Sequence, residues 1–224
     1  MNFLKVWTNT FLKRSKVKTD LMSGIYSVVL SSLVVGILTF AVLMLQPSNS
    51  DVGMSFAFLV IGTPIIALIA LFIMAAIFRW LAELSGGKSS FKKDCGVIGV
   101  YLGSLIFVVG IFSILWGAFT SAAFPGFDIA TGAGIATTNL MLFYLVEGLG
   151  MAIQFVFVVI VLGILLEELS AAEKLSMFDT AKALGLSIAV LFLLYNVVLG
   201  AMLELMLGPS KSTLEQYYQS ISGV

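Results

Sequence analysis

Long apolar stretches, separated by short polar segments, dominate the chain. Five of them reach the roughly 20 apolar residues that a helix needs to cross the hydrocarbon core of a bilayer. They cover residues 21–45, 52–78, 96–122, 138–166 and 181–207. None shows the alternation of apolar and polar residues that marks a membrane β-strand. We therefore expect an all-α fold, a polytopic bundle of five transmembrane helices.

The segment before the first stretch, residues 1–20, has a different pattern. At 100° per residue, Phe3, Leu4, Trp7 and Phe11 fall on one side of a helix and lysines fall on the other. This pattern predicts an amphipathic helix in the headgroup plane, with its basic face toward anionic lipid. The alternative is a tail that only sets the topology. The first stretch is too long for the apolar core of a signal peptide, so we expect it to be retained.

Positive charges predict the orientation of the helices. Of the 12 lysines and arginines, all but Lys211 lie before the first stretch, between the second and third, or between the fourth and the first turn of the fifth. Because cytoplasmic loops are enriched in positive residues, these segments are expected to be cytoplasmic. The sequence thus predicts a multi-pass cell-membrane protein with a cytoplasmic amino terminus and an external tail over residues 208–224.

The composition agrees with this class and excludes several others. Hydrophobic residues make up 60% of the chain and charged residues only 11%, whereas soluble domains are about 25% charged. Twelve acidic residues balance the 12 basic ones, so no net field favours nucleic acid. A single cysteine and the lack of histidine exclude an intrachain disulfide and the commonest metal ligand and general base. With no nucleophile–base pair visible, we expect a non-enzymatic protein without cofactor or metal.

Glu147 is the most unusual residue within the stretches. It lies about ten residues into the fourth, or roughly 15 Å deep at 1.5 Å per residue. Apart from Lys182 at the very start of the fifth, no basic residue occurs within the five stretches to neutralise it. It should therefore be protonated, hydrogen-bonded or facing water. Gln154 shares its helix face, and Asn196 and Glu204 mark one face of the fifth stretch.

Two interpretations of these polar residues remain open. A carboxyl group inside a membrane helix is by default a candidate for proton or cation binding. Alternatively, Glu147 is neutral and joins two helices through a hydrogen bond to Asn196, or to a tyrosine such as Tyr144 or Tyr195.

Glycines form a stripe on the third stretch. Gly96, Gly103, Gly110 and Gly117 are seven residues apart, and Gly99 adds a small-xxx-small pair with Gly103. Membrane helices approach closely where small residues line the contact. We therefore expect this stripe to pack tightly against another helix, although a substrate path along the groove is the functional alternative.

Pro64 lies near the middle of the second stretch. A proline lacks the backbone N–H and clashes with the carbonyl four residues earlier, here that of Val60. We expect the helix to kink at this point.

The two predicted cytoplasmic loops share a pattern. In the first, Gly86-Gly87 can end a helix, Lys88 follows, and Ser89 or Ser90 can cap the next helix before Phe91. Both loops contain Glu-Leu-Ser, at residues 83–85 in the first and 168–170 in the second. The second loop also has a serine before phenylalanine, at residues 176–178. The repetition suggests a duplicated helical hairpin.

The first of these loops resembles a known family. Its turn Gly86-Gly87-Lys88-Ser89-Ser90-Phe91 is similar to the Gly-Gly-Lys-Gly-Ser-Phe signature of the Yip-domain family. The segment from Leu169-Ser170 to Lys182 is similar to that family's second cytoplasmic loop, and five spans with a cytoplasmic amino end also agree. The resemblance implies an integral membrane protein of trafficking pathways, whose eukaryotic members bind prenylated Rab GTPases. The short amino-terminal segment favours a prokaryotic member.

The charges of the two loops are opposite. Residues 79–94 contain four basic and two acidic residues, whereas residues 167–182 contain two basic and four acidic ones. We expect the loops to dock into a composite platform, with Phe91 and Phe178 packed beneath, because exposed ion pairs contribute only about 0–1 kcal/mol each. The alternative is two independently solvated turns.

Together these features predict a Yip-domain-like scaffold that organises membranes or acts in trafficking. It would bind the bilayer and a membrane or cytoplasmic protein partner, or lipid, through the cytoplasmic loops, with anionic lipid at the amino-terminal helix. The alternative function is a small proton- or cation-coupled channel or transporter that uses Glu147. The sequence leaves the identity of the partner and the oligomeric state open.

Overall fold

The computed structural model describes residues 19–44, 56–124 and 137–207, and these residues are almost entirely helical, with no strand among them. The side chains of residues 137–140, 195 and 198–207 are not described. The predicted amphipathic helix, apart from residues 19 and 20, and the predicted external tail lie outside the described residues. So does the side chain of Glu204.

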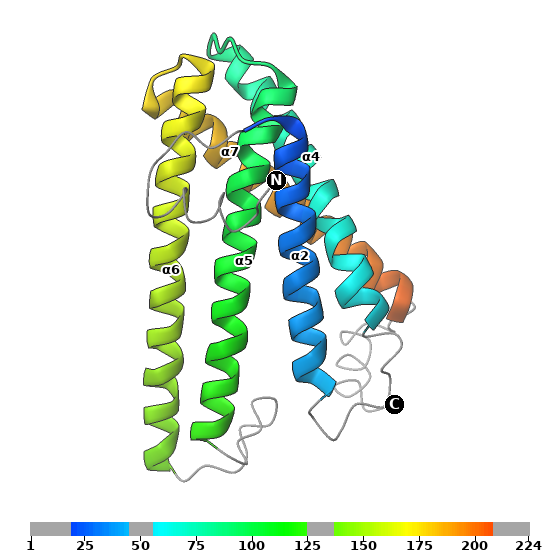
Figure 1. Ribbon diagram of the computed structural model, residues 1–224, viewed down its shortest axis with the longest axis vertical. Coiled ribbons are helices and arrows are strands. Elements are labelled where there is room, and N and C mark those ends of the chain that lie inside the picture. Colours follow the sequence, from blue (N-terminus) through cyan, green and yellow to red (C-terminus); the bar gives the residue numbers. More distant parts are fainter. Residues whose placement is uncertain (1–18, 45–55, 125–136, 208–224) are drawn as a thin grey trace, which may run out of the picture.

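The chain forms antiparallel helices that run along one long axis (Figure 1). In chain order they are α2 (Leu21–Met44), the π-helical segment η2 (Ala57–Gly62) with α4 (Thr63–Leu84), α5 (Phe91–Ala123), α6 (Thr137–Glu173) and α7 (Met177–Leu207). Five helices in this described part are long and apolar enough to cross a membrane, with η2 and α4 forming one of them. The predicted all-α polytopic bundle is thus confirmed.

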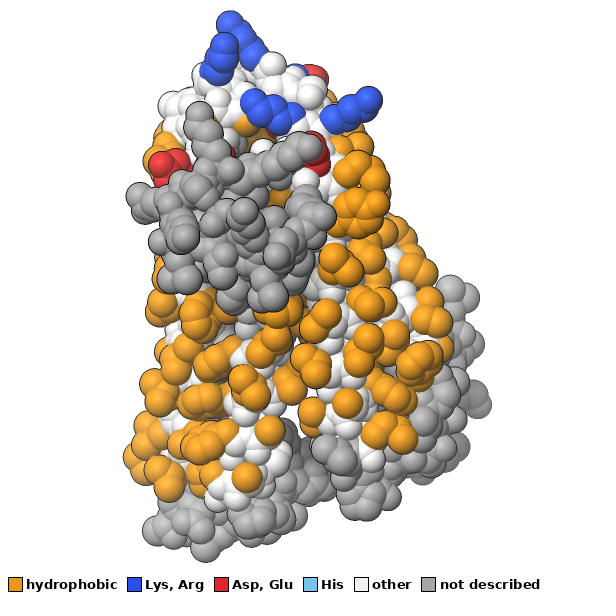
Figure 2. Space-filling model, in the orientation of Figure 1, with side chains coloured by type: hydrophobic (Ala, Val, Ile, Leu, Met, Phe, Trp, Pro, Cys, Tyr) orange, Lys and Arg blue, Asp and Glu red, His pale blue; other side chains and the backbone are white. Residues whose placement is uncertain are grey.

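Large apolar side chains cover the sides of the bundle, and lysines and arginines gather at one end (Figure 2). This end carries both short interhelical turns, residues 85–90 and 174–176, and the start of α2. We call it the loop end and the opposite one the far end. Apolar flanks between polar ends are what a lipid bilayer requires of a spanning bundle.

The helices do not pack equally against one another. α5 lies between α2 and α6, whereas α4 and α7 form a pair that leans away from α2 toward the far end (Figure 1). The buried core lies where α4, α5, α6 and α7 converge near the loop end. It includes Phe78, Ile98, Leu169 and Leu184.

Helices extend past the predicted stretches at the loop end. α4 continues to Leu84, α5 begins at Phe91, α6 continues to Glu173, and α7 begins at Met177. The apolar pattern does not predict these turns because they bear charged and polar residues. Some of these residues, such as Arg79 and Glu173, bond to each other between helices, and hydropathy alone does not reveal this contact.

Two glycines of α5 pack directly on the backbone of α2. A Cβ atom on Gly99 would lie 2.7 Å from the Cα of Gly24, and one on Gly103 would lie 2.5 Å from the carbonyl carbon of Ser27. Real Cβ atoms do not approach backbone so closely, so only glycine fits. The Ser27 hydroxyl adds a 3.2 Å hydrogen bond to the Val100 carbonyl across the same contact.

The rest of the glycine stripe divides into two parts. Gly96 also lies against the chain entering α2, at Thr19 and Asp20, and Gly110 lies against the Val35 side chain. A Cβ on Gly117 would meet nothing within 4 Å. The predicted close packing is therefore confirmed at Gly96, Gly99, Gly103 and Gly110, and is wrong at Gly117, which borders a groove between α5 and α2.

The helix irregularity predicted near Pro64 takes a specific form. The π-helical segment η2 runs directly into α4, with Pro64 in the first turn of α4. At the junction the Thr63 N–H donates to the Phe58 carbonyl, five residues earlier. The wider π turn accommodates a residue that cannot donate, so the chain remains helical across the proline.

Candidate functional site: a buried ion cluster at the loop end

Charged side chains from three helices meet at the loop end. Arg79 lies near the end of α4, Asp94 in the first turn of α5, and Glu173 is the last residue of α6. The Asp94 and Glu173 side chains are completely buried, and the Arg79 side chain is 16% exposed. We call these three residues the ion cluster. Buried charges are rare unless they are paired, so the cluster is a candidate functional site.

Arg79 and Glu173 form the centre of the cluster. The Arg79 Nη1 group donates to both Glu173 carboxylate oxygens at 3.0 Å. The other side of the guanidinium holds Glu83, one turn later on α4, with Nε 2.8 Å and Nη2 2.7 Å from Oε1. One guanidinium therefore bridges α4 and α6 while its remaining donors stay occupied.

Glu173 also holds the first loop in place. The Ser89 N–H donates to Glu173 Oε2 at 2.9 Å, and the Lys88 N–H donates to the Glu173 backbone carbonyl at 3.1 Å. Gly87 passes so close that a Cβ atom there would lie 2.5 Å from Oε2. Gly86 has a φ of +88°, a left-handed conformation that glycine adopts without strain. The Gly-Gly turn is thus shaped to wrap around this carboxylate.

Asp94 is less well paired than Glu173. Its Oδ2 atom lies 3.8 Å from Arg79 Nη1, and its surroundings include the Ser89 hydroxyl and the Glu173 carboxylate. Neither Asp94 oxygen nor the Ser89 hydroxyl oxygen has a hydrogen bond of good geometry, although all three atoms are buried. The cluster thus contains a carboxyl group that the described protein groups leave unsatisfied.

The second loop is organised by its own hydrogen bonds. The Ser170 hydroxyl donates to the Leu175 carbonyl at 2.8 Å, and Ser176 caps α7 by accepting from the Asp179 N–H at 3.1 Å. Lys182 lies 3.6 Å from Asp179 and over the ring of Phe178. Of the predicted loop motif, Gly87, Lys88 and Ser89 therefore contact Glu173, whereas Ser170 and Lys182 stay within their own turn. Ser90 precedes α5, but its side chain makes no capping hydrogen bond.

The predicted docking of the two loops is confirmed, but through different contacts. The loops meet where Lys88 and Ser89 bond to Glu173, so the joint rests on one buried carboxylate rather than on exposed ion pairs. The predicted packing beneath the loops is wrong for Phe178, which is 69% exposed, and Phe91 is itself 38% exposed. Each ring lies in the first turn of its helix and points outward.

Sequence reasoning counted Arg79, Asp94 and Glu173 only as loop charges. A signal was present, since each lies a few residues beyond an apolar stretch. A charge at that position must face water or find a partner. Whether the charge faces water or pairs with another residue depends on the neighbouring helices, and the sequence does not show them.

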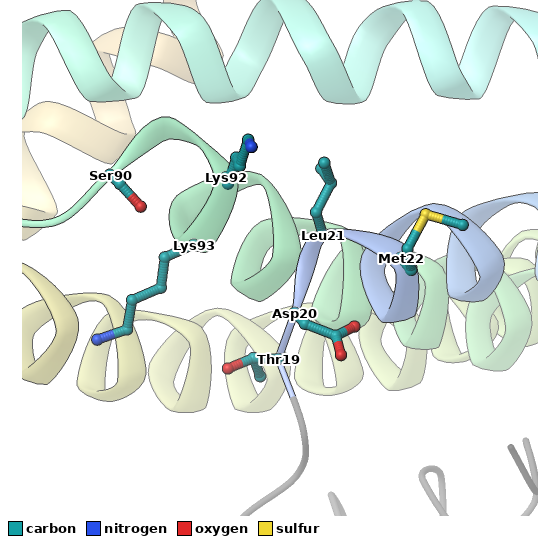
Figure 3. A pocket seen from close by; sticks show the side chains of 7 residues that line it. All are labelled: Thr19, Asp20, Leu21, Met22, Ser90, Lys92 and Lys93. Carbon is teal, nitrogen blue, oxygen red and sulfur yellow. The ribbon is translucent and has the colours of Figure 1, made fainter.

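A cavity of about 590 Å³ lies beside the start of α2 and α5. Its lining side chains come from the chain entering α2 and from the first turn of α5 (Figure 3). They are Thr19, Asp20, Leu21, Met22, Ser90, Lys92 and Lys93. Asp20 caps α2 by accepting from the Ser23 N–H at 2.7 Å. The positive charges at this cavity are the ammonium groups of Lys92 and Lys93.

The membrane polar residues do not form the predicted group. Glu147 is half-buried on α6, on the same side as Gly150 and Gln154, both of which contact α5. The Gln154 amide donates to the Ser113 hydroxyl of α5 at 3.1 Å. No hydrogen bond of Glu147 is present among the described residues.

The predicted bond from Glu147 to Asn196 is not formed. Asn196 is exposed and its amide donates to the Phe192 carbonyl of its own helix at 2.7 Å. The second half of α7 lies across the molecule from the first half of α6 (Figure 1). Tyr144 is 62% exposed, and the side chain of Tyr195 is not described.

Comparison with known proteins adds no identification. No family model, curated protein or solved structure matches this chain.

Proposed function

We propose that this protein is a non-enzymatic membrane scaffold of the Yip-domain type. Its partners bind the surface that its two joined loops form. The observation that carries the proposal is the pair of hydrogen bonds from Lys88 and Ser89 to Glu173. These bonds join the two loops into one surface. A fixed surface binds with less ordering cost than two mobile loops. The distribution of positive charges supports a cytoplasmic position for this surface.

Lipid is the second ligand of this surface. The cavity with Lys92 and Lys93 borders Leu21 and Met22 on α2, and Met22 is 53% exposed. An anionic headgroup there would contact the ammonium group of Lys92 or of Lys93 while its acyl chains follow the apolar flank. Lipid and protein binding at one end would let the protein organise the membrane around a partner.

Photocrosslinking in native membranes tests the scaffold proposal. A photoreactive residue at Lys88 and another at Lys174, both exposed, sample the two sides of the joined surface. We expect the same crosslinked species from both positions, and its loss when Glu173→Ala releases the first loop. A matched probe at Trp80, exposed on the side of α4, should not give that species. Adducts that differ between the loops, or that persist in folded Glu173→Ala protein, would contradict the proposal.

A proton or cation path through the far half is the second candidate. It is favoured by the half-buried Glu147, which has no hydrogen bond in the described part of the chain, and by the Gln154–Ser113 pair on the same side of α6. Flux into proteoliposomes should then be abolished by Glu147→Gln and kept in the exposed control Tyr144→Phe. Absence of flux from the wild type would remove this candidate.

A further inference from the structure

We infer that the ion cluster is a proton-binding site, in which Asp94 holds one proton beside the Glu173 carboxylate while the first loop is docked. The charges of the cluster lead to this conclusion. Two completely buried carboxyl groups face one guanidinium, which also holds the exposed Glu83. With both carboxyl groups ionised, the buried cluster would carry an uncompensated negative charge. Such a charge is strongly disfavoured away from water, and a carboxyl group then becomes neutral by binding a proton.

The geometry identifies where the proton resides. Both Glu173 oxygens accept from Arg79, and Oε2 accepts from the Ser89 N–H as well, so this group is bonded as a carboxylate. Asp94 is 3.8 Å from the guanidinium, and neither of its oxygens accepts a hydrogen bond of good geometry. A protonated Asp94 would gain an O–H donor, with the Glu173 carboxylate beside it as acceptor.

No other buried charge offsets Asp94 in the described structure. Of the helices packed against α5, α4 contributes Arg79 and α6 contributes Glu173. On α2, Asp20 is engaged in capping at the Ser23 N–H. On α5 itself, Lys92 and Lys93 are exposed to solvent. Hydrated ammonium groups compensate a buried carboxylate weakly, so a proton remains the means of neutralisation.

The proton links pH to the position of the first loop. Loss of the proton would place two negative groups against one guanidinium, and their repulsion would act on Glu173. Because the Glu173 carboxylate holds the Ser89 N–H, this repulsion would loosen the docked loop. Docking is therefore expected while Asp94 is protonated and is weakened as pH rises through the titration of Asp94. If the loop surface is the scaffold surface proposed above, partner binding follows the same dependence, but the proton site itself does not require that function.

Infrared spectroscopy of the full-length protein in lipid vesicles tests the inference directly. A protonated carboxyl group has a C=O stretching band that a carboxylate lacks and that shifts in D₂O. We expect this band at neutral pH in Glu147→Gln protein, where the membrane carboxyl of α6 cannot contribute. The band should disappear in Asp94→Asn/Glu147→Gln protein, because the amide removes one negative charge and with it the need for a proton.

A spin label supplies the second measurement. Lys88 is exposed, so a nitroxide on Lys88→Cys in a Cys95→Ser background reports whether the loop is docked. Its mobility should increase over the pH range in which the band is lost, and Asp94→Asn should keep it immobile across that range. A folded Glu147→Gln protein without the band at neutral pH would overturn the inference, even if Asp94→Asn fails to fold. A band that survives Asp94→Asn, or a loop whose docking follows sodium rather than pH, would also overturn it.

Discussion

The two ends of this bundle differ in how closely the helices pack and in how their charged groups are placed. At the loop end, α2 and α5 touch backbone to backbone at Gly99 and Gly103, and charged groups are buried and paired. In the far half, Gly117 is open, and a groove of about 560 Å³ lies between α2 and α5. There Glu147 is half-buried without a hydrogen bond in the described part of the chain. The loop end thus joins buried charged groups of three helices around Arg79, whereas no such ion cluster is present in the described part of the far half.

The comparison shows that close packing and buried ion pairs can be concentrated at one end of a membrane bundle. Between hydrocarbon and helix there is no hydrophobic driving force, so helices stay together through close packing and polar contacts. The closest packing joins α2 and α5, and the buried ion pairs lie where α4, α5, α6 and the first loop converge. We expect substitutions to destabilise the protein strongly at the loop end and weakly in the far half.

Replacing Arg79 should produce the largest effect. Arg79→Met leaves buried carboxyl groups without their cation, and breaking a buried ion pair typically costs about 3–5 kcal/mol. The free energy of unfolding, measured by denaturant titration in detergent micelles, should fall by that amount.

Two variants serve as controls for Arg79→Met. Lys182→Met removes an exposed cation at the same end, and should change the free energy of unfolding by no more than about 1 kcal/mol. Glu147→Leu replaces the carboxyl group of the far half with a membrane-compatible residue, and should cause no loss of stability. Equal losses in all three proteins would show that the two ends do not differ.

A second comparison uses two glycines of the same helix. In Gly99→Ala the new methyl group meets the Gly24 backbone, and overpacking of this kind costs about 1–3 kcal/mol. In Gly117→Ala the methyl group meets nothing within 4 Å, so the better helix propensity of alanine should leave stability unchanged or raise it by up to about 1 kcal/mol. Thermal unfolding of both variants in lipid nanodiscs checks this difference, and equal midpoints would contradict it.

The smallest expected effect concerns the polar contact between α5 and α6. The Gln154–Ser113 hydrogen bond should contribute about 0.6 kcal/mol, the average for polar contacts between membrane helices. A double-mutant cycle with Gln154→Leu and Ser113→Ala measures the coupling energy. A value above about 2 kcal/mol would mean that the far half is held together as firmly as the loop end.

Several features could be predicted because they depend on local pattern. Apolar runs long enough to span a bilayer indicate helices whatever their neighbours are. The Gly99–Gly103 pair indicated a close helix contact, and Gly86-Gly87 indicated a turn. In each case the residue type restricts the backbone within a few positions of itself.

Other features depended on which helices become neighbours. The partner of the glycine stripe, α2, and the end of that contact before Gly117 follow from the directions of whole helices. Asn196 was expected near Glu147, but α7 carries it away from α6. Apolar helices offer many equivalent faces to lipid, so hydropathy does not select one arrangement.

By itself the sequence determined the class of this protein, because the bilayer accepts only closed backbone structures and the apolar runs have the length of a span. Only the tertiary structure decided that Arg79, Asp94 and Glu173 meet, since 94 residues separate Arg79 from Glu173 along the chain. A charge just past an apolar run can face water or a partner at similar local cost. The convergence of α4, α5 and α6 removes the water, and the pairing follows from that.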